Sequence, residues 1–246
     1  MKAKGIMIVT GGSRGIGAST SILAAKHGFD VCINYNTNKE RAQQVAKEVE
    51  SNGRKALIYQ ANMANEAEIK AMFAAVDAEL GQVSVLVNSA GVTGSAGRVD
   101  QLTAEDLSLL LQTNIQGTFL CCKEAILRMS TKHGGSGGAI VNISSAAARL
   151  GAAGRNVHYA ASKGAIETMT FGLAQEVALE SIRVNAVSPG VINTEMQDPK
   201  RLADIIPKLP MGRAGTAQEV AEAVLWLAST ESSYVSGTVL NVSGAR

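Results

Sequence analysis

A tyrosine and a lysine four residues apart, Tyr159 and Lys163, could together transfer a proton. On a helix this spacing places both side chains on one face, with Cβ atoms about 5–6 Å apart. At an effective dielectric of about 20, a cation at that range favours a neighbouring phenolate by roughly 3 kcal/mol. That stabilisation would lower the pKa of the tyrosine by about two units, toward the range in which a general acid or base works near neutrality. Taken alone, a pair at this spacing is more often an ordinary surface pair.

A glycine-rich turn near the start of the chain could hold a phosphate. The motif Thr10-Gly-Gly-Ser-Arg-Gly-Ile-Gly17 follows an apolar run and opens a helical pattern. Gly11 can take a backbone conformation closed to residues with a Cβ, and Gly15 and Gly17 let the chain approach a pyrophosphate closely. The unpaired N–H groups at the start of the following helix favour an anion. A plain strand-to-helix turn is the alternative.

These groups need a scaffold, and the chain alternates apolar strand patterns with helical ones. Strands are expected near 4–9, 30–35, 55–60, 83–88, 138–143, 182–187 and 238–242, and helices near 16–27, 38–52, 65–80, 103–132, 159–180 and 216–229. The strand patterns are mostly apolar without alternation, as in a parallel sheet covered on both faces. Repeated strand–helix units bring ligand sites to the carboxyl ends of the strands. The sequence therefore predicts an α/β, doubly wound (Rossmann) fold in a single domain, 1–246, with a mostly parallel seven-stranded sheet and helices on both faces.

The prolines mark an irregular segment. All four lie within 22 residues, at Pro189, Pro199, Pro207 and Pro210. Proline restricts φ and removes a backbone donor, so this segment should be neither a central strand nor a long helix. We interpret residues 193–212 as a flexible flap over the site. A surface excursion without a role is the alternative.

Composition argues against several other classes of function. The 246 residues include 23 basic and 21 acidic ones, mixed along the chain, without the basic block of a nucleic-acid-binding protein. Cys32, Cys121 and Cys122 have no paired spacing and are expected to be reduced and buried. The scattered histidines give no metal-ligand pattern. The first apolar run ends within about five residues, too short for a signal-peptide core or a membrane span, so we expect a cytoplasmic protein without membrane or nucleic-acid partners.

The motifs occur together and in order, which a chance tyrosine–lysine pair would not explain. Each falls at a strand end or a helix position facing one crevice: Thr10-Gly-x-x-x-Gly-x-Gly17, Asn88-x-Ala90-Gly91, Asn114, Ser145, Tyr159-x-x-x-Lys163 and Pro189-Gly190. With this set the sequence resembles the classical short-chain dehydrogenase/reductase family over essentially its whole length. The resemblance implies an NAD(P)-dependent enzyme that transfers hydride between nicotinamide and a carbonyl or alcohol.

The resemblance also implies a role for each of four catalytic residues. Tyr159 would be the general acid in reduction and the base in oxidation, while Lys163 would hold the nicotinamide ribose and lower the pKa of Tyr159. Ser145 would hydrogen-bond the substrate oxygen, and Asn114 would hold a water of the proton relay. Ser145 is favoured over Ser144 because the family's serine precedes its tyrosine by about a dozen residues, and Ser145 precedes Tyr159 by 14.

The same resemblance assigns the residues that would bind the cofactor. They are Gly11, Ser13, Arg14, Gly15, Ile16 and Gly17 in the glycine turn; Tyr35, Asn36 and Thr37 after the second strand; Asn62 and Met63 after the third; Asn88, Ala90 and Gly91 after the fourth; Tyr159 and Lys163; and Pro189, Gly190, Ile192 and Thr194. Two positions depart from the usual pattern, with Ser89 in place of an asparagine and Asn62 in place of an aspartate. The Asn62 carbonyl can still accept a hydrogen bond from an adenine amino group.

NADP(H) is expected in preference to NAD(H). In dinucleotide folds an acid at the end of the second strand binds the ribose 2′-hydroxyl and repels a 2′-phosphate. The stretch Cys32–Asn38 contains no acid, and Tyr35 stands where the family's NAD-selecting aspartate would be. Arg14 could offer a guanidinium to the phosphate, with neighbouring polar side chains adding hydrogen bonds. A solvent-facing Arg14 without that role is the alternative.

For the substrate, the pattern is closest to the 3-oxoacyl-thioester reductases and to polyol or sugar dehydrogenases. The loop 93–97 with Arg149, Arg155, Asn156 and His158 is expected to line the mouth of the site, and it is more polar than a long acyl chain would need. A nucleotide-sensing protein that kept the fold and lost the chemistry is the second class of function. The complete set of four catalytic residues favours the enzyme.

The helical stretches 103–132 and 159–180 carry more apolar residues than one sheet face requires. These are Leu107, Leu110, Leu111, Ile166, Met169 and Leu173. Together with the family resemblance, this excess indicates a homotetramer built on the two helices. The alternative is that all six residues belong to the core.

Overall fold

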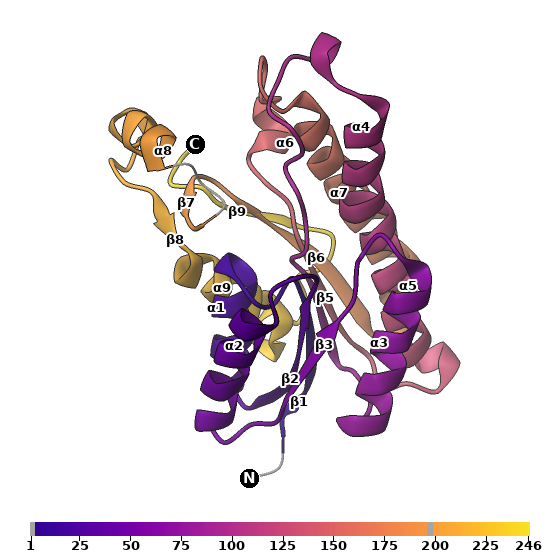
Figure 1. The fold of residues 1–246 in the computed structure, drawn as a ribbon. Helices are drawn as coiled ribbons and strands as arrows, with labels where there is room; N and C mark the ends of the chain where they lie inside the picture. The colour runs from indigo at the N-terminus through magenta and orange to yellow at the C-terminus, as the bar shows by residue number, and fades with distance from the viewer. Residues whose placement is uncertain (1–2, 196–198) are drawn as a thin grey trace.

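The computed structural model describes residues 3–195 and 199–246, which fold around one parallel seven-stranded sheet (Figure 1). The strand order is β3-β2-β1-β4-β5-β6-β9, and every neighbouring pair is parallel. The strands are β1 (Gly5–Thr10), β2 (Phe29–Tyr35), β3 (Ala56–Gln60), β4 (Val85–Asn88), β5 (Gly138–Ile143), β6 (Ile182–Pro189) and β9 (Val239–Val242). The predicted doubly wound fold is confirmed.

Helices cover both faces of this sheet (Figure 1). One layer consists of α1 (Gly15–Lys26), α2 (Lys39–Ser51) and α9 (Ala217–Ala228). The other consists of α3 (Glu66–Glu79), α5 (Gly117–Met129) and α7 (Val157–Glu176), with α4 (Ala104–Leu111) packed beside α7. Both faces of the strands are therefore buried, which explains why their sequences do not alternate.

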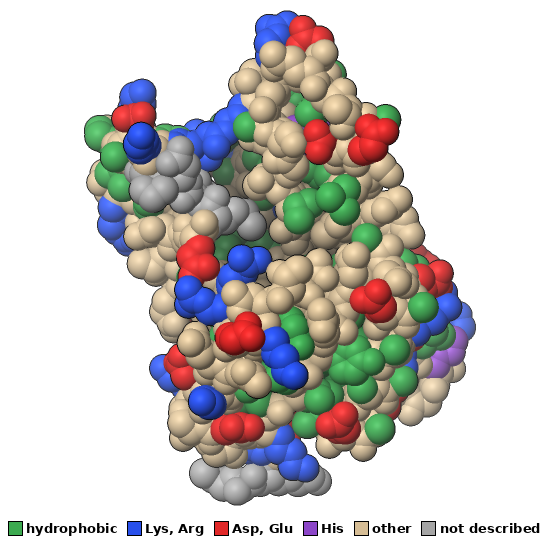
Figure 2. Space-filling model, in the orientation of Figure 1, with side chains coloured by type: hydrophobic (Ala, Val, Ile, Leu, Met, Phe, Trp, Pro, Cys, Tyr) green, Lys and Arg blue, Asp and Glu red, His purple; other side chains and the backbone are tan. Residues whose placement is uncertain are grey.

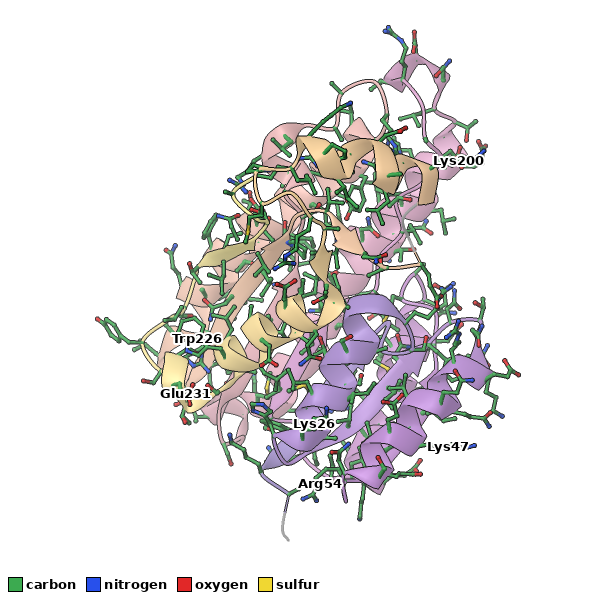
Figure 3. All side chains as sticks on the ribbon, turned by 90° about the vertical axis from the view of Figure 1, so that its left-hand side faces the viewer. Lys26, Lys47, Arg54, Lys200, Trp226 and Glu231 are labelled. Atoms are coloured by element: carbon green, nitrogen blue, oxygen red, sulfur yellow. The ribbon has the colours of Figure 1, made fainter. Side chains whose placement is uncertain are left out.

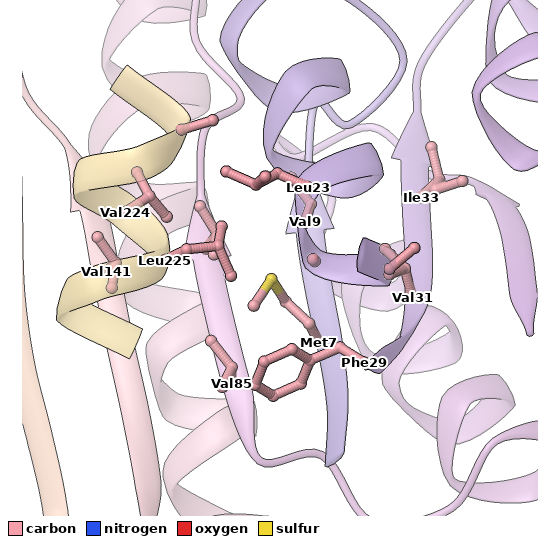
Figure 4. Packing of buried hydrophobic residues seen from close by; sticks show 14 of the residues in the cluster. Met7, Val9, Leu23, Phe29, Val31, Ile33, Val85, Val141, Val224 and Leu225 are labelled. Atoms are coloured by element: carbon pink, nitrogen blue, oxygen red, sulfur yellow. The ribbon is translucent and has the colours of Figure 1, made fainter. Parts of the chain in front are cut away.

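Strand β1 contributes to both halves of the core. Met7 and Val9 pack with Phe29 and Val85 in the cluster beneath α1 and α9 (Figure 4), whereas Ile8 joins the cluster beneath α3 and α5. All of these side chains are buried. A strand that is anchored on both faces holds the turn that follows it in a definite place.

The expected helix at 103–132 is wrong in one respect, because it is not continuous. A π-helical turn, η2 (Gln112–Gln116), separates α4 from α5. At Gly117, the first residue of α5, any Cβ would collide with the backbone oxygen of Met63, so the helix passes directly against the loop after β3. π-Helical turns often occur at functional sites, and this one contains Asn114.

Short elements complete the fold. After β5 comes α6 (Ala147–Leu150), and β7 (Ile192–Asn193) pairs with β8 (Gly215–Thr216), with α8 (Pro199–Ile205) between them in the chain. The 3₁₀ turns are η1 (Val99–Gln101), η3 (Thr131–His133), η4 (Ala178–Glu180), η5 (Ile206–Lys208) and η6 (Thr230–Ser232). Residues 196–198 of the predicted flap lie outside the described residues, and its flexibility stays a prediction. Within the described part of the chain, no helix is long and apolar enough to cross a membrane.

Candidate active site

The predicted residues meet at the carboxyl edge of the sheet, where β1 lies beside β4. The chain continues from β1 toward β2 and from β4 toward β5, on opposite sides, so a crevice opens between the two strand ends. The molecular surface is hollowed there, between the region around α8 and the region around α4 (Figure 2). This is the position at which doubly wound folds bind their ligands.

The glycine turn between β1 and α1 forms an open cradle. Gly11 and Gly15 have φ angles of +62° and +51°, and a Cβ on Gly11 would lie 2.9 Å from the Cα of Ala90. The N–H of Gly11 donates to Oδ1 of Asn34 at 3.0 Å, which ties the turn to β2. Among the described residues, no side chain caps the first turn of α1, so its N–H groups can meet an anion. The cradle therefore fits the pyrophosphate of a dinucleotide.

The loop after β4 runs from this cradle to Lys163. The Thr10 hydroxyl oxygen accepts hydrogen bonds from the N–H groups of Ser89 (3.0 Å) and Ala90 (3.1 Å). A Cβ on Gly91 would lie 3.3 Å from Oδ1 of Asn114 and 3.5 Å from Nζ of Lys163. The absence of a side chain at Gly91 thus lets the loop pass close to both residues.

Tyr159, Lys163 and Ser145 form a compact group. Nζ of Lys163 lies 5.8 Å from the centre of the Tyr159 ring and donates to the backbone oxygen of Ile143 at 2.8 Å. Ser145 follows β5 and hydrogen-bonds the Tyr159 side chain. Its Oγ also accepts the N–H of Ala147 at 3.1 Å.

Burial controls the proton affinities of this group. It lowers the pKa of Lys163 from 10.5 to about 8. It also raises the pKa of Tyr159 above its ordinary value, and the hydrogen bond from Ser145 offsets part of that rise. The expected lowering of the Tyr159 pKa is therefore wrong in this structure, because the loss of solvation outweighs the hydrogen bond from Ser145.

The two adjacent serines have different surroundings. Ser144 is only 2% exposed, and its hydroxyl donates to Oε1 of Glu167 at 2.8 Å, with the backbone oxygen of Lys163 at 3.3 Å as a second acceptor. Ser145 is only partly buried and lies against Tyr159. The hydroxyl of Ser144 is thus committed to internal acceptors, and the predicted catalytic role of Ser145 stays a prediction.

Asn114 joins the loop after β4 to α7. Its Oδ1 accepts the N–H of Val92 at 2.8 Å, and its Nδ2 donates to the Val92 oxygen at 2.9 Å and to the Ser162 hydroxyl at 3.0 Å. These three bonds occupy the amide of a side chain that is 1% exposed. Its predicted role in holding a water stays a prediction.

The predicted ribose-binding residues are only partly brought together. Arg14, Asn36 and Thr37 are exposed at the ends of the glycine turn and β2. Tyr35 is 5% exposed and belongs to the core cluster beneath α1 and α2, so its side chain does not join them. The exposed residues directly after β2, Asn36 and Thr37, are therefore polar and uncharged.

The segment after β6 lies across the glycine turn. The Pro189 oxygen accepts the N–H of Ala146 at 2.8 Å, which holds this segment to the turn that carries Ser145. A Cβ on Gly190 would lie 2.7 Å from the Cα of Ser243, so the chain is tightly packed there. A Cβ on Gly15 would lie 3.4 Å from Cγ2 of Thr194. The first residues of the predicted flap therefore contact the cradle, while Ile192 is buried.

Several other predicted contacts shape the floor of the crevice. Asn88 is buried and donates to Oδ1 of Asn142 at 2.9 Å. The N–H of Asn62 donates to Oε2 of Glu68 at 2.7 Å. Met63 is 5% exposed and belongs to the core. The side chains of Asn88 and Met63 thus face the interior in this structure.

Sequence reasoning missed two buried residues that support the site, Asn34 and Asn142, and it named Thr10 only as part of the glycine motif. Asn34 holds the glycine turn through Oδ1 and donates to the Ala61 oxygen at 2.9 Å through Nδ2. Asn142 is fully buried within β5. A polar residue inside a buried apolar strand needs an internal partner, and that rule could have identified both asparagines.

The cradle and the Ser–Tyr–Lys group define the class of protein as a dinucleotide-binding α/β oxidoreductase. A family profile described as Enoyl-(Acyl carrier protein) reductase matches residues 11–244. The chain is 48% identical to an uncharacterized oxidoreductase, YgfF, of Escherichia coli, covering 98% of this chain and 99% of that protein. It is 34% identical to the 3-oxoacyl-[acyl-carrier-protein] reductase FabG of Staphylococcus aureus, covering 99% and 98%.

Structural comparison agrees with these sequence relationships. The chain matches a short chain dehydrogenase from Burkholderia cenocepacia in complex with NADP, with a TM-score of 0.91 and 33% identity over 97% of this chain and 96% of that one. This chain therefore belongs to the short-chain dehydrogenase/reductase family, whose members use a nicotinamide cofactor. The resemblance predicted from its motifs is confirmed.

Proposed function

We propose that this chain is an NADP(H)-dependent reductase of small carbonyl compounds. The observation that carries the proposal is the hydrogen bond between Ser145 and Tyr159, one helical turn from the buried amine of Lys163. The group lies at the same sheet edge as the glycine cradle. Two hydroxyls in this arrangement can hold a carbonyl oxygen and protonate it as negative charge develops.

In the proposed mechanism the bound cofactor supplies or accepts the hydride. With a substrate bound, the O–H of Ser145 turns from Tyr159 to the substrate oxygen, while its Oγ continues to accept the N–H of Ala147. Tyr159 has a raised pKa and is protonated at neutral pH, so it gives its proton to that oxygen in reduction. Lys163 binds the ribose hydroxyls and relays a proton back to Tyr159 by way of a water held at Asn114. In oxidation Tyr159 accepts the one proton of the substrate hydroxyl and passes it on through the same relay.

The preference for NADP(H) is supported by the surface at the end of β2. Asn36 and Thr37 are exposed there, Arg14 is exposed in the glycine turn, and the stretch Cys32–Asn38 has no carboxylate to repel a 2′-phosphate. A guanidinium and neutral polar groups are suited to bind a phosphate. The related Burkholderia structure is a complex with NADP.

For the substrate we propose a 3-oxoacyl thioester or a similarly small ketone, with a sugar or polyol as the second candidate. The relative from Staphylococcus aureus is named a 3-oxoacyl-[acyl-carrier-protein] reductase. The predicted mouth is rich in polar residues, and its two segments are joined, because the N–H of Gly97 donates to the Arg155 oxygen at 2.7 Å and Asn156 donates to the Thr93 oxygen at 3.2 Å. Such a mouth suits short or polar substrates.

The test is NADPH oxidation against a panel of small ketones, diketones, ketoses and acetoacetyl thioesters. We expect turnover with at least one member, and a loss of about a hundredfold or more in Tyr159→Phe, since that variant lacks only the transferable proton. Its affinity for NADPH should stay nearly unchanged. Tight NADPH binding without turnover of any member would favour the nucleotide-sensing alternative. More than a few per cent residual activity in Tyr159→Phe would remove Tyr159 from the mechanism.

We also propose that the chain forms a homotetramer through α4, α5 and α7. Of the residues predicted for the interface, Leu110, Ile166 and Met169 are buried in the monomer and belong to its core. Leu173, also predicted, is partly buried against the core. The predicted Leu107 and Leu111 are exposed and support the proposal, as do the exposed side chains of Phe119, Leu127 and Phe171. Aromatic side chains at a surface are typical of interfaces.

A reducing, cytoplasmic setting is proposed as well. Cys32, Cys121 and Cys122 are free and buried. Burial raises the pKa of Cys32 and of Cys122 to about 12, so both thiols are unreactive at neutral pH. Free thiols without disulfides are typical of intracellular proteins.

A further inference from the structure

Helix α7 carries a polar stripe that faces the end of β5. Lys163, Glu167 and Thr170 are four and three residues apart, which places them on one side of the helix. Each is hydrogen-bonded to one of three consecutive residues, 142–144, where β5 ends. Around this stripe the contact between α7 and the sheet is apolar, with Ile166 and Met169 in the core cluster.

Each bond in the stripe has a definite direction. Nζ of Lys163 donates to the oxygen of Ile143 at 2.8 Å, and Nδ2 of Asn142 donates to the Thr170 hydroxyl at 3.0 Å. Between them, the Ser144 hydroxyl donates to Oε1 of Glu167 at 2.8 Å, and the Lys163 oxygen at 3.3 Å is its weaker second acceptor. Apolar packing alone is compatible with small sliding movements, whereas directional bonds define how far α7 lies along β5.

The Ser144–Glu167 bond is the one adjacent to the proposed catalytic serine. Ser144 is 2% exposed, so its hydroxyl needs an internal partner, and a carboxylate is a strong acceptor. The backbone N–H of Ser144 donates to the Val187 oxygen at 2.8 Å. The turn that begins at Ser144 is therefore hydrogen-bonded to β6 through the backbone of Ser144 and to α7 through the Ser144 side chain.

We propose that Glu167, acting through Ser144, is a positioning residue that holds Ser145 at hydrogen-bonding distance from Tyr159. The assignment rests on the proposed function, because it gives Ser145 and Tyr159 their catalytic roles. Tyr159 is carried by α7 and Ser145 by the turn after β5, so the relative position of the two hydroxyls depends on how these elements are joined. The Ser144–Glu167 bond joins them directly at that point.

The test compares Glu167→Ala, Glu167→Gln and Ser144→Ala with the wild type. We expect kcat to fall about tenfold or more in Glu167→Ala and Ser144→Ala, because small displacements of a catalytic group lower rates steeply. The KM for NADPH should change by less than about threefold, since Lys163 keeps its own bond to Ile143. Glu167→Gln should retain most of the activity, because its amide oxygen still accepts the Ser144 hydrogen bond.

A second readout separates positioning from general loss of stability. The hydrogen bond from Ser145 lowers the pKa of Tyr159, so a displaced Ser145 should shift the tyrosine limb of the pH–rate profile upward in Glu167→Ala and Ser144→Ala. Glu176→Ala is the matched control, because Glu176 is an exposed glutamate in the last turn of the same helix. That variant should leave kcat and the profile unchanged.

The outcomes distinguish this inference from the proposed function. If folded Glu167→Ala keeps the wild-type kcat and pH profile, Glu167 has no positioning role. If the wild type reduces no member of the carbonyl panel, the proposed function has failed, and the phenolate absorbance of Tyr159 then decides the inference. The phenolate absorbance is titrated in the wild type and in Glu167→Ala, and the titration of the same protein carrying Tyr159→Phe is subtracted from each. The pKa of Tyr159 should be higher in Glu167→Ala. Equal pKa values would overturn the inference.

Discussion

Among single residues, Lys163 shows how strongly the tertiary environment acts on the site. Its amine is buried and bonded to a backbone oxygen, and its pKa falls from 10.5 to about 8. Between about pH 8 and pH 10.5, Lys163 therefore carries a proton in the unfolded chain but not in the folded chain. The contribution of Lys163 to the free energy of unfolding therefore rises as the pH goes from about 8 to about 10.5, by about 3 kcal/mol at most.

Replacing Lys163 by methionine should remove this pH dependence. The quantity to measure is the difference in unfolding free energy between wild type and Lys163→Met, from urea denaturation at pH values from 7.5 to 10.5. We expect the wild type to gain stability relative to the variant across that range, by up to about 3 kcal/mol. The difference cancels the opposite effect of Cys32 and Cys122, whose raised pKa values make the folded state less stable above pH 9. A difference that does not change with pH would show that Lys163 titrates normally.

Cofactor preference is also decided by a few residues. We expect a higher kcat/KM with NADPH than with NADH, and Arg14→Ala should raise the KM for NADPH about tenfold, the effect of one charge-assisted contact. Asn36→Asp should shift the preference toward NADH, because it adds a carboxylate at an exposed position after β2. Tyr35→Asp is the substitution that the sequence alone indicates, but Tyr35 is buried, so that variant is expected to destabilise the fold. A wild-type preference for NADH would contradict the proposal.

At the scale of elements, the loop after β4 depends on its close contact with α7. A Cβ on Gly94 would lie 2.7 Å from Nε2 of His158 and 3.0 Å from Cδ1 of Leu110, and Gly94 has a φ of +68°. His158 is buried directly before Tyr159 in α7. The loop and the first turn of the catalytic helix are therefore packed so closely that Gly94 cannot gain a side chain without movement.

Gly94→Ala should displace this loop and lower kcat/KM as well as stability. Gly53→Ala is a matched control, because Gly53 has a φ of +71° but no atom within 4 Å of its Cβ position. Both variants should lose about 1–2 kcal/mol from the left-handed backbone conformation alone. Only Gly94→Ala should lose more stability than this, as measured by thermal unfolding. Only Gly94→Ala should also have a lower turnover, as measured by NADPH oxidation. Equal losses in both variants would mean that the contact with His158 has no influence on the site.

At the scale of the whole molecule, the two helical layers present different surfaces. The layer of α1, α2 and α9 carries charged residues such as Lys26 and Lys47, with Trp226 at the outside of α9 (Figure 3). The opposite layer exposes Phe119 and Phe171, whose side chains are 51% and 45% exposed. An interface formed by α5 and α7 would bury these two aromatic side chains and would be stabilised by their removal from water.

Light scattering at micromolar concentration should give four times the chain mass of 25.5 kDa. Phe119→Asp combined with Phe171→Asp should dissociate the assembly, because each carboxylate would be buried in the interface. Val99→Asp is a control at another exposed apolar residue, located in η1, and should leave the mass unchanged. A wild-type mass of one chain would refute the tetramer.

The sequence by itself determined the fold and most of the candidate site, because both depend on short stretches of chain. Continuous apolar strands with intervening helical patterns define a parallel sheet, and the glycines that need a positive φ or a close approach lie within one turn. The spacing of Tyr159 and Lys163 places them on one helical face wherever the helix packs. The strand and helix positions expected from these patterns agree with the structure, except that the helix at 103–132 is interrupted.

Only the tertiary structure decided features that depend on residues distant in the chain. The π-helical turn at Asn114 lies where α5 meets the loop after β3, a contact between residues 117 and 63. The opposite pKa shifts of Tyr159 and Lys163 arise from burial by the surrounding fold, which residue spacing does not reveal. The inward position of Tyr35 has the same origin. Solvation and long-range packing are properties of the assembled chain, so these features could be read only after the sheet and both helical layers were in place.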